Sequence, residues 1–353
     1  VLSTAQTAAL TTAQIAALES TDLAAFNAAQ VAVFNSAQVG AIETTDIGAL
    51  NTNAVRALST AGIQGLTSDQ VVALTSAQVG ALTSSQTGAL NTSQAAAIQT
   101  SDIDAMSTAA VRALTTAAVA ALDTDQVSAL NTAQTSALTS SQVQSLTTAQ
   151  VAALQSTDLA AMNSAQVGAL NTAQAAAIET TDVSALNTTN VRALSTAAVN
   201  ALTTDQIAAL TTAQTSVLTT AQAGALNTAQ VAALESTDLA AFSSAQVAVF
   251  NSAQIGAIET SDISALSTNA VRAIVTNSLV GLTTDQVVAL TSNQIGALTS
   301  AQTAVLNTAQ PSAIQTTDIS AMSTTAVRAL TTAAVAALGT DQINAMNTAQ
   351  VAA

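Results

Sequence analysis

A large apolar residue returns every eight residues along this chain. Every eighth residue from Leu2 to Met346, 44 in all, is Leu, Ile, Phe or Met. With that residue as position 1, the octad follows the consensus L-[TNSEQ]-[ST]-x-[QDA]-[VIL]-x-A. The register never slips, so residues 1–353 are interpreted as one domain, a continuous array of 44 octapeptide repeats over 2–353. Neither end carries an atypical polar capping repeat, so we expect a segment of a longer chain.

A period of eight excludes one continuous α-helix. Eight residues at about 100° each rotate the apolar position by about 80° per octad, so no fixed apolar face or coiled-coil seam would form. The helix must therefore break once in every octad. Since one octad buries only a Leu, a Val and one or two Ala, it must also stack on its neighbours to be stable.

The octad contains residue types that begin and end helices. Ser or Thr at position 3 predicts an N-cap, followed by a helix of about six residues that ends at the next position 1. Asn at position 2, as in Asn51, is expected just past the helix in a left-handed cap. Pro311, at position 6, is expected to be the third helical residue, whose N–H lacks an intrahelical partner. All five Arg occupy position 7, where the helix dipole favours cations: Arg56, Arg112, Arg192, Arg272 and Arg328.

The acidic residues follow a second, longer period. Octads that carry them begin 24 or 32 residues apart, and the mean spacing is about 26.7 residues, or 3.33 octads. This alternation predicts an all-α solenoid with about 3.3–3.4 octads per superhelical turn and one acidic stripe. A β-solenoid with inward Leu and Thr ladders is the alternative, because Thr and Val favour strands. Abundant Ala, few Gly and the placement of Arg and Pro favour helices.

The composition argues against several classes of function. The chain has no His, Cys, Lys, Tyr or Trp, so we expect no enzyme, no Ser-His-Asp triad, no thiolate and no Schiff base. A net charge of −15 with five cationic residues predicts no nucleic-acid partner. Ser, Thr, Asn and Gln interrupt every octad, so no membrane insertion is expected despite a mean hydropathy of +0.45.

The acidic stripe contains the candidate metal ligands. Calcium prefers hard oxygen ligands, and the superhelix is expected to stack acids from successive turns. The Ca²⁺ candidates are Glu19, Asp22, Glu43, Asp46 and Asp69. The favoured interpretation is that these acids lie in first helical turns and supply solubilising charge, with no other cofactor. The Phe residues at position 1 are expected to fill the core.

The repeat Leu146-Thr147-Thr148-Ala149-Gln150-Val151-Ala152-Ala153 resembles an octapeptide family of very long secreted or surface proteins of bacteria. The resemblance covers the whole chain and implies an extracellular structural role. We therefore expect part of an extracellular filament, stalk, sheath or surface layer that associates with itself, laterally or end to end. The alternatives are an adhesin stalk that binds Ca²⁺ or glycans through the acidic stripe, and an ice-binding protein if the fold is a β-solenoid.

Overall fold

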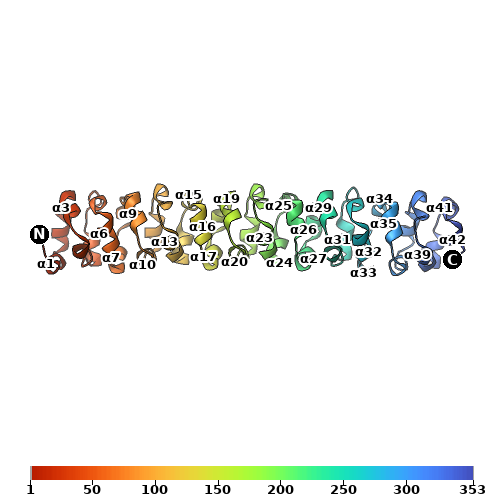
Figure 1. The fold of residues 1–353 in the computed structure, drawn as a ribbon, viewed down its shortest axis with the longest axis horizontal. Coiled ribbons are helices and arrows are strands. Elements are labelled where there is room, and N and C mark those ends of the chain that lie inside the picture. Colours follow the sequence, from red (N-terminus) through yellow and green to blue (C-terminus); the bar gives the residue numbers. More distant parts are fainter. Residues whose placement is uncertain (1, 353) are drawn as a thin grey trace. The chain divides into compact units, whose positions relative to one another are not determined.

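The computed structural model describes residues 2–352, and this part of the chain is helical throughout. It holds 42 α-helices of four to six residues and two 3-10 helices, with no strand in the described range. The chain divides into two compact units, Val1–Ile178 and Glu179–Ala353. Within each unit, successive helices wind around a common axis (Figure 1). The prediction of an all-α solenoid is confirmed, and the β-solenoid alternative is wrong.

The helices follow one another at the spacing of the octad. In the first unit they are α1 (Thr4–Ala8), α2 (Thr12–Ala16), α3 (Ser20–Ala25), α4 (Ala28–Val31), α5 (Ser36–Gly40), η1 (Ile47–Ala49), α6 (Thr52–Ala57), α7 (Thr60–Gly65), α8 (Ser68–Val72), α9 (Ser76–Ala81), α10 (Ser84–Thr87), α11 (Thr92–Ala96), α12 (Thr100–Ile103), α13 (Thr108–Ala113), α14 (Thr116–Ala121), α15 (Thr124–Ser128), α16 (Thr132–Ala137), α17 (Ser140–Ser145), α18 (Thr148–Ala152), α19 (Ser156–Ala161), α20 (Ser164–Val167) and α21 (Thr172–Ala176). In the second they are α22 (Thr180–Val183), α23 (Thr188–Ala193), α24 (Thr196–Ala201), α25 (Thr204–Ala208), α26 (Thr212–Ser216), α27 (Thr220–Ala225), α28 (Thr228–Ala232), α29 (Ser236–Ala241), α30 (Ser244–Val247), α31 (Ser252–Ala257), η2 (Ile263–Ala265), α32 (Thr268–Ala273), α33 (Thr276–Leu279), α34 (Thr284–Ala289), α35 (Ser292–Ala297), α36 (Ser300–Thr303), α37 (Ala309–Ser312), α38 (Thr316–Ile319), α39 (Thr324–Ala329), α40 (Thr332–Ala336), α41 (Thr340–Ala345) and α42 (Thr348–Val351).

Helix α17 shows how one octad begins and ends a helix. Its N-cap is Thr139, at position 2, which has an extended backbone and accepts a hydrogen bond from the Gln142 backbone N–H. The Gln142 side chain in turn accepts from the Thr139 backbone N–H, which completes a capping box. At the other end, Leu146 returns to extended backbone (φ −60°, ψ 139°) and ends the helix. Position 1 therefore both enters the core and breaks the helix.

The predicted cap positions were wrong by one residue. The N-cap is position 2, and the Ser or Thr at position 3 is the first helical residue, as Thr139 and Ser140 show. Asn at position 2 is not a left-handed residue past the previous helix: Asn51 has extended backbone and caps α6. No residue other than Gly has a positive φ in residues 2–352, and neither does any Gly. The Arg residues do lie in the last turns of their helices, as predicted, for example Arg112 in α13.

Pro311 lies where it was predicted, but the predicted reason for its tolerance was wrong. Pro311 is the third residue of α37, as expected. In other octads, however, the N–H at position 6 has a partner: Val71 N–H donates to the Thr67 carbonyl at 3.0 Å. Pro311 removes that bond, and α37 begins one residue later in its octad than most other helices. The octad tolerates proline by shortening the helix.

Within each unit, helices pack against helices that lie three octads away along the chain. Helix α13, for example, contacts both α10 and α16. The core consists of the side chains at positions 1 and 6, such as Leu114 and Val111. The Phe residues lie in this core as expected, where Phe26 and Phe34 pack edge to face with ring centroids 5.6 Å apart. The stacking of octads agrees with a turn of slightly more than three octads.

Candidate functional site

The residue that links one superhelical turn to the next is the Gln at position 5. Every Gln at this position from Gln30 to Gln350 is buried. Gln is a mostly exposed residue type in proteins. Its burial therefore requires hydrogen-bond partners for the whole amide group.

We call the hydrogen bonds of a position-5 Gln side chain a Gln bridge. Gln142 shows its geometry. Its Oε1 accepts from the Thr139 N–H at 2.8 Å. Its Nε2 donates to the Val111 carbonyl at 3.0 Å and to the Leu114 carbonyl at 2.8 Å. These acceptors lie 31 and 28 residues earlier, at the C-terminal end of α13. One side chain thus caps the start of its own helix and the end of another.

The same bridge recurs in both units. In the second unit, Gln222 Nε2 donates to the Val191 and Leu194 carbonyls at 2.9 and 2.8 Å. Each bridge therefore joins octad n to octads n−4 and n−3, so that a turn holds between three and four octads. The predicted superhelical period agrees with this spacing. Each of these hydrogen bonds contributes about 1 kcal/mol, and the penalty for leaving a buried partner unpaired is larger.

Asp replaces Gln at position 5 in eight octads. These residues are Asp22, Asp46, Asp102, Asp158, Asp182, Asp238, Asp262 and Asp318. A carboxylate has no donor for the carbonyls of the earlier helix, so buried members accept from hydroxyl groups of the preceding turn instead. Thr132 Oγ1 donates to Asp158 at 3.0 Å, and Thr215 Oγ1 donates to Asp238 at 3.1 Å. Burial raises the pKa of both Asp158 and Asp238, although these hydroxyl bonds oppose the shift.

The five predicted calcium ligands do not gather into one cluster. Glu19 is the N-cap of α3 and Asp22 is its third residue, while Asp69 is the second residue of α8. Glu43 is exposed, and Asp46 precedes η1. No group of three or more acidic residues that would suit a metal ion occurs in residues 2–352.

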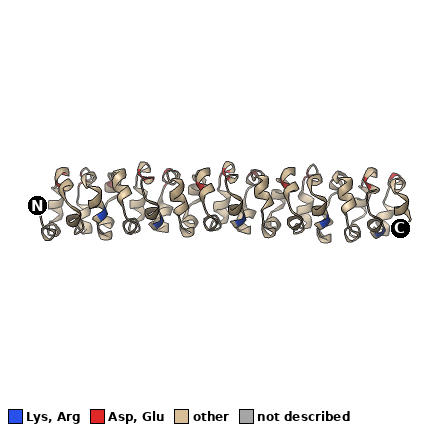
Figure 2. Ribbon diagram, viewed as in Figure 1, with Lys and Arg blue, Asp and Glu red and all other residues tan. Residues whose placement is uncertain are grey.

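The charged residues nevertheless take separate sides of each unit. In Figure 2 the acidic positions of each unit gather toward one side of its winding, and the arginines gather toward another. The stripe expected from the acid period is therefore visible within each unit. The first-turn placement of Asp22, Asp69 and Asp125 agrees with favourable interactions with helix dipoles.

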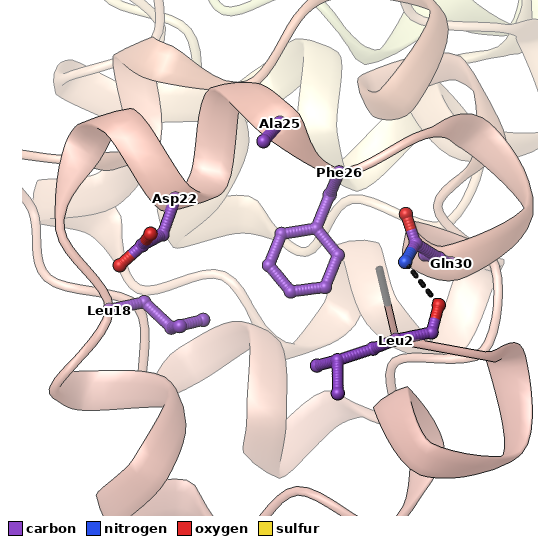
Figure 3. A pocket seen from close by; sticks show the side chains of 6 residues that line it. All are labelled: Leu2, Leu18, Asp22, Ala25, Phe26 and Gln30. Carbon is purple, nitrogen blue, oxygen red and sulfur yellow. Dashed lines mark hydrogen bonds between the residues drawn. The ribbon is translucent and has the colours of Figure 1, made fainter.

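A hollow of about 460 Å³ lies in the first turn of the described chain. Figure 3 shows Phe26 between Leu18 and Leu2, with Asp22 at the side and Gln30 donating to the Leu2 carbonyl at 2.7 Å. Its lining is mainly apolar, and the Gln30 amide is already bonded to the Leu2 carbonyl, so the hollow gives no evidence of a binding site.

Comparison with known proteins identifies the repeat. Within residues 2–352, no helix has the length and apolar character that crossing a membrane requires. No functionally characterised protein matches the chain significantly. The ALTTAQ repeat model matches eight segments that together span well over half of the chain: residues 15–41, 39–76, 95–132, 151–177, 175–212, 231–258, 255–292 and 312–348. The chain therefore belongs to the ALTTAQ repeat family.

Proposed function

We propose that this repeat protein is a structural segment of an extracellular filament, stalk, sheath or surface layer of a bacterium. The observation that carries the proposal is the Gln bridge, which repeats the same bonds between turns in both units. Each octad in such a protein is stabilised by its neighbours, so the array can be extended into a long and regular molecule. A long, regular molecule is what a filament, stalk, sheath or surface layer requires. The resemblance to long secreted bacterial octapeptide proteins supports the extracellular location.

The chemistry of the side chains supports a structural role over a catalytic one. The chain has no His, Cys or Lys, and its carboxylates recur along a periodic array. The buried carboxylates Asp158 and Asp238 accept from hydroxyl groups of the fold itself. We propose that the chain is not an enzyme and that its partner is a further copy of itself.

Immunogold labelling of the producing cells tests the location. Antibodies raised against the purified chain should label intact cells or extracellular material as strongly as permeabilised cells. A cytosolic marker provides the control, because it should be labelled only after permeabilisation. Negative-stain microscopy of the purified chain should show filaments or sheets. Labelling restricted to permeabilised cells would reject the extracellular role, and a monodisperse chain at high concentration would reject self-association.

A further inference from the structure

The two units contain a matching pair of small hollows, each beside an arginine. Their volumes are about 330 and 340 Å³, at the small end of the range for ligand sites. Both are lined by an Arg, a Gly, a Leu and two Ser at corresponding places in the repeat. These residues are Arg56, Gly80, Leu82, Ser84 and Ser107 in the first unit, and Arg272, Gly296, Leu298, Ser300 and Ser323 in the second.

Each hollow lies where a Gln bridge is missing. A Gln at position 110 would reach the carbonyls 31 and 28 residues earlier, which belong to Val79 and Leu82. Ala110 stands there instead, so it offers no side-chain donor to them. In the second unit Ala326 takes the same place with respect to Leu298. The missing amide leaves space and frees the hydrogen-bonding capacity of the Leu carbonyl.

Two other arginines show what happens where the bridge is present. Ala110 lies 54 residues after Arg56. The residues 54 positions after Arg112 and Arg192 are Gln166 and Gln246. Gln166 Nε2 donates to the Thr135 and Leu138 carbonyls at 2.9 and 2.8 Å. Gln246 makes the corresponding bonds to Thr215 and Leu218. The hollows at Arg56 and Arg272 therefore arise where two Arg octads are seven octads apart.

We propose that these two hollows bind an acidic sugar, a pyranose that carries a carboxylate. Arg56 is exposed and supplies a planar guanidinium, which suits a carboxylate because it can donate two parallel hydrogen bonds. Leu82 also lines the hollow, and its carbonyl can accept from a hydroxyl group as it would from a Gln amide. The ligand therefore needs a carboxylate and hydroxyl donors in one compact molecule.

The serine hydroxyls complete the match to a sugar. Ser84 Oγ donates to the Ala109 carbonyl at 3.2 Å, so its oxygen remains able to accept from a ligand. Ser107 Oγ accepts from the Ala110 N–H at 3.1 Å, so its hydrogen remains able to donate. A sugar hydroxyl both donates and accepts, and it can satisfy each of these groups. A simple anion such as sulfate would use the arginine and Ser107 and would leave the Leu82 carbonyl without a donor.

Isothermal titration calorimetry of the full chain tests the proposal. The probes are galacturonic acid, glucuronic acid, N-acetylneuraminic acid and trigalacturonate, with galactose and inorganic sulfate as comparisons. We expect one of the acidic sugars to bind with two sites per chain and at least 10-fold more tightly than galactose or sulfate. The double variant Arg56→Gln/Arg272→Gln should weaken this binding at least 10-fold. Arg112→Gln is the matched control and should leave it unchanged.

A second double variant tests the hollow separately from the charge. Ala110→Gln/Ala326→Gln should restore the missing bridges, keep the circular dichroism spectrum and abolish sugar binding while both arginines remain. The proposal is overturned if no acidic sugar shows saturable binding up to about 10 mM. It is equally overturned if Arg112→Gln lowers the affinity as much as the Arg56/Arg272 double variant. Sulfate binding as tight as the sugar would show recognition of charge alone and would reject the sugar ligand.

Discussion

Replacing Gln142 by Glu removes one bridge without changing the size of the side chain. The introduced carboxylate keeps an oxygen for the Thr139 N–H, so the capping box survives. It loses the two donors to the Val111 and Leu114 carbonyls and places a negative charge beside them. Gln14→Glu is the matched control, because Gln14 is exposed and caps only its own helix through Thr11.

The expected cost follows from the bonds that are lost. Two hydrogen bonds contribute about 2 kcal/mol, and an unpaired charge at a buried site adds at least about 1–3 kcal/mol. The local free energy of opening should therefore fall by about 3–5 kcal/mol in Gln142→Glu. The control should change by less than about 0.5 kcal/mol, since Glu is a normal partner in a capping box.

Hydrogen exchange of the native protein, followed by mass spectrometry, resolves these local changes. Peptides that cover α13 and α17 should exchange at least about 100-fold faster in Gln142→Glu at pH 7, since 1.4 kcal/mol corresponds to a factor of ten. Burial beside carbonyls raises the pKa of the introduced carboxyl, so acidification should protonate it and recover part of the protection. Equal effects of Gln142→Glu and Gln14→Glu would refute the assigned role of the bridge.

Three further outcomes are expected. Burial raises the pKa of Asp158, so the protonated carboxyl stabilises the fold below the ordinary Asp pKa, and this stabilisation is lost as pH rises. Asp158→Asn should therefore raise the melting temperature by about 1–2 °C at pH 7, and this gain should vanish near pH 3. Gly65→Ala should lower the free energy of unfolding in urea by about 3 kcal/mol, because its Cβ would lie 2.1 Å from the Ser36 carbonyl oxygen. Gly48→Ala is the control and should leave this free energy nearly unchanged, because the nearest atom to its Cβ would lie at 3.4 Å. Millimolar CaCl₂ should leave the melting temperature unchanged, because the acids of residues 2–352 form no cluster of three that would suit a metal ion. A rise of several degrees, absent with MgCl₂, would contradict this expectation.

The octad period and the residue classes at its positions were sufficient to predict the helices, but the cap was assigned to the wrong residue. Position 3 is almost always Ser or Thr, which made it the obvious cap. The better signal was the spacing: Thr67 and Gln70 form the Thr-x-x-Gln pattern of a capping box, and position 3 has no Gln three residues later. The choice of position 2 therefore lay in the sequence.

The bridge between turns was harder to find in the sequence. The acid period predicted which octads become neighbours, but it does not show that Gln142 reaches the end of α13. Gln is mostly exposed in proteins, and a first-turn amide needs no distant partner to be explained. The hollow beside Arg56 was beyond sequence reasoning for the same reason, because it depends on a bond that Ala110 fails to make. Only the three-dimensional pairing of residues 28 and 31 apart identifies Ala110 as an omission.

The direction of the Gln bridge has a consequence for how such a chain folds. Gln142 donates to carbonyls 28 and 31 residues before it, and Gln222 does the same. Each octad that leaves a ribosome or a translocation pore therefore finds its partners already made, and it closes the end of a helix that emerged about four octads earlier. Because the sequence separation of these contacts stays fixed, contact order per turn does not grow with length. Such a chain can fold turn by turn during its emergence, and an array several times longer would add turns at the same rate.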